Sequence, residues 1–317
     1  MTAFRDTAVA APGLSARRRR FGGWRQGLPG YLFLAPWLAG FFLLTLGPTL
    51  VSLYLSFTDF DLLRSPQWIG GANYERIFTS DPKFWTSVGV TLSYVALSVP
   101  LKLGFALAVA MWLNRGIAGL GIYRAIFYLP SLLGGSVAVA ILWKQVFGYD
   151  GLVNQLLWLV FGVNGPSWIS NPATSLYTLV LLSVWQFGSP MIIFLAGLRQ
   201  IPRDLYEAAS IDGATRRQQL TRITLPLLAP VIFFNLVLQT IEAFKAFTPA
   251  FIISGGTGGP VDSVLFYTLY LYQQGFAYFR MGYASALAWI LLLTIAAFTA
   301  LAFLSQRYWV YYEDDPR

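Results

Sequence analysis

Long apolar stretches, separated by short polar segments, dominate this chain. A helix that crosses a lipid bilayer needs about 20 consecutive, mainly apolar residues. Stretches of that length and character occupy residues 31–57, 86–113, 125–147, 174–198, 227–253 and 281–306. Backbone groups inside a bilayer must pair within the protein, which favours helices. The pattern therefore predicts an all-α integral membrane protein with six transmembrane helices, whose membrane domain covers residues 31–306.

The composition supports this prediction and excludes several kinds of active site. Only 11% of the 317 residues are charged, whereas soluble domains have roughly 25%. The chain contains no Cys and no His, which excludes disulfides, cysteine nucleophiles, Ser-His-Asp triads and the usual zinc sites. No phosphate-binding loop ending in Lys-Ser/Thr is present. We therefore expect no catalytic residue, no metal site and no bound cofactor, and the chain is predicted not to be an enzyme.

The positive charges are distributed unevenly between the two sides of the predicted membrane domain. One side, which includes both termini, holds fifteen Lys and Arg residues, against four on the other side. Because cytoplasmic segments carry the excess of Lys and Arg, both termini of this multi-pass cell-membrane protein are predicted to be cytoplasmic. Residues 1–30 form an N-terminal arm and residues 307–317 a C-terminal tail in this interpretation. The net charge of +8 then reflects membrane topology, and no nucleic-acid partner is expected.

Ionisable residues inside the predicted spans need a reason, because charge within a bilayer is costly. Glu242 and Lys245 are three positions apart on the fifth span, so they share a helix face and can form an ion pair. The same face, together with Gln239 and Asn235, can instead line a pathway for a substrate rich in hydroxyl groups.

Lys102 lies two residues after Pro100 on the second span. We expect it to bind the carbonyl that the proline frees or to pair with a partner subunit. A proton-coupling role would need an acidic partner, and Glu242 is the only acidic residue within a predicted span.

The segment between the fourth and fifth spans, residues 199–226 (RQIPRDLYEAASIDGATRRQQLTRITLP), is longer than a simple connection needs. Pro202 is at a position where a helix can begin. Gly213 can break the chain between two short amphipathic helices, because glycine adopts positive φ freely. Two such helices can dock in a groove on another protein or rest on lipid headgroups, and the residues alone leave both alternatives open.

The spacing within this segment resembles a known motif. Glu207-Ala208-Ala209 is followed after three residues by Gly213, and after nine more by Ile223-Thr224-Leu225-Pro226. This is similar to the EAA motif of binding-protein-dependent ABC importer permeases. A softer resemblance to sugar-importer permeases of the maltose-permease F-subunit type covers residues 35–60, 68–78, 243–260 and 281–291. The resemblance implies the type I ABC importer permease fold.

In that family the motif forms coupling helices that sit in a groove on the ATPase subunit. The resemblance implies that Glu207 makes a polar contact there, that Ala208 and Ala209 allow close approach, and that Gly213 turns the chain. The residues that it assigns to ATPase coupling are Glu207, Ala208, Ala209, Asp212, Gly213, Ile223, Leu225 and Pro226.

The middles of the fourth and fifth spans contribute to the transported-sugar site in the family. Matching by distance from the motif implies a substrate pathway in this chain. Its residues are Trp185, Gln186, Ser189, Asn235, Gln239, Glu242 and Phe247. Amide and carboxylate groups can hydrogen-bond sugar hydroxyls, and aromatic faces can stack on sugar rings.

The resemblance also implies partners and a mechanism. The chain would pair with a second, G-subunit-like permease subunit, with two ABC ATPase subunits that bind ATP and Mg, and with an extracytoplasmic sugar-binding protein. Closure of the ATPases on ATP would move the coupling helices and alternate the access of a central cavity. Alternatives are an importer for glycerol-3-phosphate or another polyol phosphate, which Lys102 and Lys245 would suit, and a proton-coupled secondary transporter that uses Glu242 and Lys245.

Overall fold

The computed structural model describes residues 28–116 and 119–310, and these residues are mostly helical. The predicted N-terminal arm, apart from its last three residues, lies outside the described residues, as does the end of the predicted C-terminal tail. The chain divides into two compact units, Met1–Val51 and Ser52–Arg317.

The first unit contains a helical run that agrees with the first predicted span. The run comprises α1 (Leu28–Gly40), a π-helical turn η2 (Phe41–Leu46) and the first part of α2 (Gly47–Ser56). A Cβ atom at Gly47 would lie 2.9 Å from the carbonyl oxygen of Phe42, so this wide turn requires a residue without a side chain. Phe33 is 88% exposed, as expected of a surface that meets lipid or a partner chain.

A short β-ribbon and a helix follow at the start of the second unit. β1 (Thr58–Asp59) pairs antiparallel with β2 (Gln67–Trp68), and α3 (Ala72–Thr79) comes next. The side-chain amide of Asn73 donates to the carbonyl oxygens of Ser56 and Thr58 at 2.9 and 3.0 Å. This buried amide fixes the start of α3 against the end of α2 and the start of β1.

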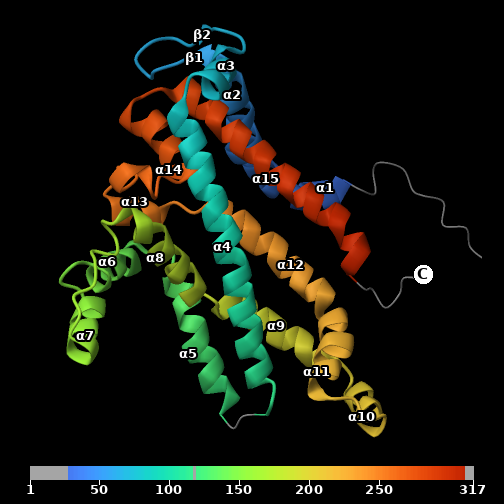
Figure 1. Ribbon diagram of the computed structural model, residues 1–317. Helices are drawn as coiled ribbons and strands as arrows, with labels where there is room; N and C mark the ends of the chain where they lie inside the picture. The colour runs from blue at the N-terminus through green and yellow to red at the C-terminus, as the bar shows by residue number, and fades with distance from the viewer. Residues whose placement is uncertain (1–27, 117–118, 311–317) are drawn as a thin grey trace, which may run out of the picture. The chain divides into compact units, whose positions relative to one another are not determined.

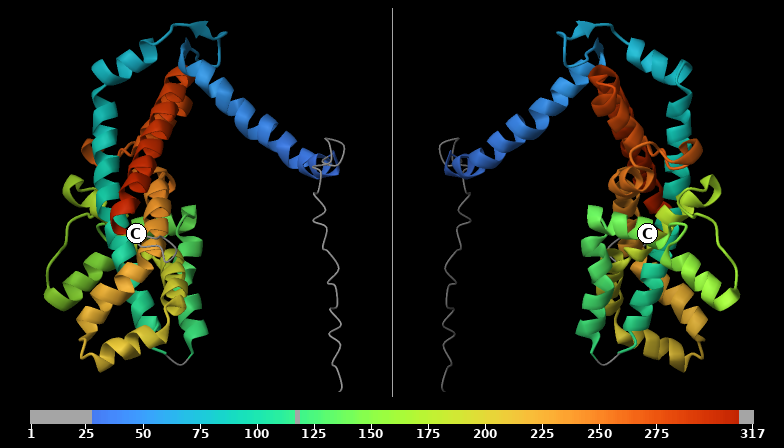
Figure 2. Two further views of the ribbon diagram at one scale, coloured as in Figure 1. Left: turned by 90° about the vertical axis from the view of Figure 1, so that its right-hand side faces the viewer. Right: turned by 90° about the vertical axis from the view of Figure 1, so that its left-hand side faces the viewer.

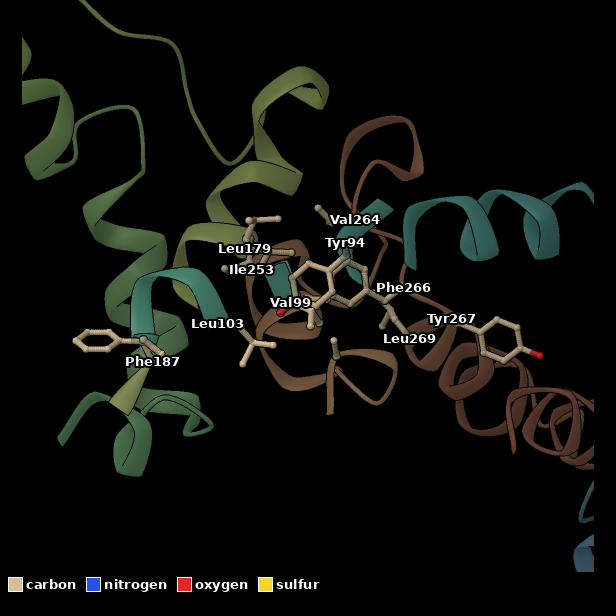
Figure 3. Close-up of a cluster of buried hydrophobic side chains, with 14 of the residues drawn as sticks. Tyr94, Val99, Leu103, Leu179, Phe187, Ile253, Val264, Phe266, Tyr267 and Leu269 are labelled. Carbon is tan, nitrogen blue, oxygen red and sulfur yellow. The ribbon is translucent and has the colours of Figure 1, made fainter. Parts of the chain in front are cut away.

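The helix α4 (Pro82–Leu113) is the central element of the second unit, and Figure 1 shows it running between the other helices of that unit. Its 32 residues extend about 48 Å. Its main packing partners are α8 (Pro172–Trp185), α9 (Gly188–Gln200), α12 (Leu225–Phe244) and α14 (Tyr267–Tyr272). Tyr94 and Leu103 of α4 belong to the buried apolar cluster that Figure 3 shows in part, with Leu179 and Phe266 from the neighbouring elements.

Two of the predicted spans are bent pairs of helices, a feature that the hydrophobic pattern does not indicate. Residues 125–147 fall on α5 (Leu120–Leu133) and α6 (Val137–Val146), which are bent by 97°. Residues 174–198 fall on α8 and α9, which are bent by 42°. At the first break, two glycines follow α5 and the Ser136 hydroxyl then accepts the Val139 amide at 3.3 Å as the cap of α6.

Counting each bent pair as one span, up to six segments of the described chain are long and apolar enough to cross a membrane. The four that are not bent pairs are Phe33–Ser56, Pro82–Leu113, Arg216–Ser254 and Met281–Trp309. This confirms the expected all-α architecture. The segment at residues 151–163 forms α7 (Leu152–Phe161), which at 10 residues is too short to span.

The chain after α12, from residue 248 to residue 277, folds into a compact segment, so the end of the predicted fifth span lies in a separate short helix. It comprises α13 (Thr248–Ser254), the 3-10 turn η4 (Pro260–Asp262), α14 and the π-turn η5 (Gln273–Ala277), and leads to α15 (Met281–Trp309). Leu265 and Leu269 within it are fully buried. Helices of six or seven residues are too short to show a clear helical period.

The carboxylate of Asp81 connects the start of α4 with α14 and α15. One oxygen caps α4 by accepting the backbone amides of Lys83 and Phe84 at 3.1 and 3.2 Å. The other oxygen accepts hydrogen bonds from the hydroxyls of Tyr270 and Tyr283. Burial, reinforced by the bond to Asp81, raises the pKa of Tyr270, so this hydroxyl stays protonated and donates at neutral pH.

Asp81→Ala should destabilise the second unit, because it removes the cap of α4 and leaves two tyrosine hydroxyls without their acceptor. We expect a loss of about 2–4 kcal/mol in the free energy of unfolding. The measurement is the midpoint of thermal unfolding in detergent, followed by tryptophan fluorescence. Asp150→Ala, which removes an exposed carboxylate, is the matched control. Equal midpoints for the two variants would contradict the connecting role of Asp81.

Gly188→Ala should also destabilise the protein, because α9 begins directly against α5. A Cβ atom at Gly188 would lie 2.3 Å from the carbonyl oxygen of Phe127 and 2.7 Å from the Cα atom of Tyr128. Overpacking against backbone costs about 1–3 kcal/mol. Gly104→Ala on α4 meets no atom within 4 Å, so this control should be neutral or slightly stabilising. A Gly188→Ala midpoint at or above that of the control would refute the close contact.

Candidate functional site

The predicted coupling segment, residues 199–226, folds as two short helices and a π-turn that lead into α12. These elements are α10 (Arg203–Ile211), α11 (Arg216–Gln219) and η3 (Leu220–Thr224). The two helices lie on either side of Gly213, as the sequence indicates, and Pro226 is in the first turn of α12. All eight residues that the motif assigns to coupling therefore lie in or next to this one continuous segment, and their contact with an ATPase remains a prediction.

Gly213 ends α10 in the left-handed conformation, with φ at 76°. The N–H of Ala214 donates to the carbonyl of Ala209 at 2.8 Å, and the N–H of Gly213 donates to the carbonyl of Ser210 at 3.1 Å. These are the two hydrogen bonds of a Schellman motif. A Cβ atom at Gly213 would meet no atom within 4 Å, so glycine is needed here for its backbone conformation and not for lack of space.

Polar side chains fix α10 against the chain that follows it. The Gln219 amide donates to the Ser210 hydroxyl at 2.9 Å, and the hydroxyls of Tyr206 and Thr224 share a hydrogen bond of 2.9 Å. Thr215 forms a capping box at the start of α11. Bonds within the segment thus hold α10 at a defined angle to the start of α12.

One face of α10 is apolar and exposed. Ile211 is 87% exposed and Leu205 is 43% exposed, and Ala208 between them is exposed as well. Three-residue spacing places these side chains on one side of the helix, and the exposed carboxylate of Glu207 lies beside them. An exposed apolar helix face with an adjacent charge is typical of a helix that docks in a groove on another protein.

The coupling segment lies at the opposite end of α4 from the β1–β2 ribbon and α3, as Figure 1 and Figure 2 show. Because α4 is long and apolar enough to cross a membrane, these two parts of the second unit lie at opposite ends of a membrane-spanning helix.

A cavity of about 430 Å³ lies beside the middle of α4, a size typical of small-molecule sites. Its walls come from α4, from the α5–α6 and α8–α9 breaks, from the end of α12 and from the turn before α13. Five of the seven predicted pathway residues line it, namely Gln186, Ser189, Gln239, Glu242 and Phe247.

Two of the predicted pathway residues, Trp185 and Asn235, are not among those that line this cavity. Trp185 packs its ring against Trp143, with ring centroids 6.0 Å apart. Asn235 is fully buried and donates to the carbonyl of Val231 at 3.1 Å. It lies one helical turn before Gln239, so the spacing indicated the correct face of α12, but the cavity does not extend that far along the helix.

Ser131 lines the cavity and was not singled out from the sequence. Its hydroxyl donates to the carbonyl of Gln186 at 2.9 Å and accepts the N–H of Ser189 at 3.0 Å, so it pairs backbone groups on both sides of the α8–α9 break. The side chain of Gln186 in turn donates to the carbonyl of Gly134 at 3.1 Å. Pro130 and the pair Gly134-Gly135 were a local signal for a break in the third span. No local signal connects Ser131 to a helix 55 residues later.

Three charged side chains line the cavity. Glu242 and Lys245 form the ion pair that their spacing predicted, with 3.1 Å between nitrogen and oxygen. Lys102 is half-buried on α4 and within electrostatic range of Glu242. Among the described residues it forms no hydrogen bond and no ion pair. The expected bond between Lys102 and the carbonyl freed by Pro100 is therefore wrong, although Pro100 lies inside α4. The alternative, a pair with a partner subunit, stays a prediction.

The chain matches the family model of binding-protein-dependent transport system inner membrane components over residues 25–310. The probable ABC transporter permease protein YesP of Bacillus subtilis (strain 168) is 54% identical, over 91% of this chain and 94% of that protein. The lactose transport system permease protein LacF of Rhizobium radiobacter is 33% identical, over 88% of this chain and 94% of that protein. Both relatives are permeases of comparable length.

A crystal structure of a bacterial alginate ABC transporter in complex with an alginate pentasaccharide-bound periplasmic protein contains a chain with the same fold. The TM-score is 0.77 and the sequence identity 23%, and the match covers 89% of this chain and 95% of that chain. The expected type I importer permease fold and the resemblance to sugar-type permeases are thereby confirmed. This multi-pass membrane chain belongs to the family of binding-protein-dependent transport system inner membrane components.

Proposed function

We propose that this chain is a permease subunit of an ATP-driven importer for carbohydrates. The observation that carries the proposal is that one helix, α12, joins the coupling segment to the polar cavity. It runs without interruption from Leu225 to Phe244 and places Glu242 in the cavity wall, about 26 Å from its start. The similarity to a lactose permease, together with cavity amides that can bind hydroxyl groups, supports a carbohydrate as the substrate.

The proposed assembly contains a second, G-subunit-like permease subunit, two ABC ATPase subunits and an extracytoplasmic carbohydrate-binding protein. The alginate transporter, which has the same fold, was solved in complex with a periplasmic protein. The exposed face of α10, with Leu205 and Ile211, would dock in a groove on one ATPase, and Glu207 would make a polar contact at its edge. ATP and Mg would be bound by the ATPase subunits and not by this chain.

The charge asymmetry of the loops supports a topology with both termini in the cytoplasm. The coupling segment then faces the ATPases, and the β1–β2 ribbon faces the binding protein. Closure of the ATPases on ATP would displace α10. Because the Tyr206–Thr224 hydrogen bond links α10 to the turn before α12, the displacement would reach α12 and change the access of the cavity.

Glu207→Lys should abolish coupling, because it places a cation where the proposed contact needs a carboxylate. Reversing one charge of an interfacial pair costs more than about 2 kcal/mol, so we expect uptake of the transported sugar to fall at least about tenfold. Uptake into proteoliposomes that contain the complete complex is the measurement, and the unfolding midpoint should not change. Glu75→Lys, at an exposed carboxylate of α3, is the control. Normal uptake by the Glu207→Lys variant would contradict the assignment of residues 199–226 as the coupling segment.

The variants Gly213→Val and Gly213→Asn test whether coupling needs the left-handed backbone conformation at residue 213. A β-branched residue in the left-handed region costs about 1–2 kcal/mol, whereas asparagine tolerates this region. We expect uptake to fall about tenfold in Gly213→Val and to stay near the wild-type rate in Gly213→Asn. Similar uptake by both variants would show that the angle set at Gly213 does not matter for coupling.

A further inference from the structure

The side chains that line the cavity beside α4 carry two positive charges and one negative charge. Its charged lining residues within the described chain are Lys102, Lys245 and Glu242. Lys245 bonds to Glu242 at 3.1 Å, and a single carboxylate neutralises a single ammonium group. One positive charge of the cavity is therefore without a counter-charge among the described residues.

Lys102 is the side chain at which this charge is most costly. It is half-buried near the middle of a helix that can cross a membrane, and Tyr94 and Val99 of the same helix line the cavity with it. An ammonium group at such a depth is strongly disfavoured unless it is paired. A neutral side chain would form this part of the wall at lower cost, so the lysine is expected to meet a ligand of opposite charge.

The other polar groups of the cavity suit hydroxyl groups. The amides of Gln186 and Gln239 both donate and accept hydrogen bonds, and Phe247 adds an aromatic ring. The cavity thus combines one anion-binding group with neutral groups that bind hydroxyls, and a carbohydrate that carries an acidic group has this combination of chemistry.

We propose that the cavity selects acidic carbohydrates, with the Lys102 ammonium binding a carboxylate or phosphate group and with Gln186 and Gln239 binding hydroxyls. This inference rests on the proposed function, because it specifies the charge of the carbohydrate that the importer carries. A uronate or a sugar phosphate forms a charge-assisted hydrogen bond with Lys102, whereas a neutral sugar leaves the ammonium group unpaired. The usual strength of such a bond corresponds to a preference of about tenfold or more.

The test is direct binding to the purified complex of this chain with its partner subunits, in detergent and without the binding protein. The first probes are the galacturonic acid trimer and the galactose trimer, which differ only in the oxidation state of carbon 6. Calorimetry should give at least about tenfold tighter binding of the acidic trimer. Galacturonic acid and galactose 6-phosphate then show whether the anion is a carboxylate or a phosphate, and tighter binding of either one than of galactose supports the proposal.

Three variants of the same complex test whether Lys102 causes the preference for the acidic trimer. Lys102→Met should bind both trimers with equal affinity, and Lys102→Arg, which retains the charge, should keep the preference for the acidic trimer. Lys144→Met is the matched control, because Lys144 ends α6 and does not line the cavity. Its preference should equal that of the wild type.

Equal binding of the two trimers to the wild type, or an acidic preference that survives in Lys102→Met, would overturn the charge selectivity and leave carbohydrate import standing. Absence of binding for every sugar would overturn the proposed carbohydrate function as well. Loss of the second permease subunit from the Lys102→Met complex would place Lys102 in the interface between subunits and would also overturn this inference.

Discussion

Backbone groups inside a bilayer need hydrogen-bond partners from the protein. The structure of the cavity depends on how the backbone at the break between α8 and α9 finds such partners. Pro190 has no N–H for the carbonyl of Gln186, four residues earlier. The helix is interrupted at Gln186 and Phe187, and the hydroxyl of Ser131 binds the Gln186 carbonyl instead. Non-helical backbone is tolerated at this depth where it is buried in protein or lines a cavity, and the α8–α9 break does line one. The bend and the cavity therefore have a common origin.

α12 is the unbroken counterpart of these bent helices. One end is tied to α10 through the hydroxyls of Tyr206 and Thr224, and the other carries the Glu242–Lys245 pair in the cavity. A continuous helix transmits a displacement along its axis, whereas a break between two helices can absorb it. This difference between neighbouring helices suits a protein in which a movement at one end of the membrane domain must change a site near its middle.

Features of this chain that depend on neighbouring residues were predictable from its sequence, and features that depend on contacts between distant segments were not. The spans were predicted because about 20 apolar residues in succession have one stable arrangement in a bilayer. The Glu242–Lys245 pair and the turn at Gly213 depend on residues within a single helical turn. The turn was predicted, and the pair was one of two alternatives that the spacing left open. The buried segment at residues 248–277 and the bridging role of Ser131 depend on contacts between distant segments, and no periodic pattern indicated them.

The sequence by itself determined the membrane class, the all-α architecture and the family, because apolar length and motif spacing are properties of contiguous residues. Five of the seven residues expected along a substrate pathway line one cavity, and their contact with a substrate stays a prediction. Only the tertiary structure decided that Lys102 of α4 shares a cavity with Gln186 and Glu242, and that Asn235 does not. The physical reason is that helix crossings are set by packing between segments far apart in the chain, so the position at which a cavity begins and ends along a helix is not encoded in that helix alone.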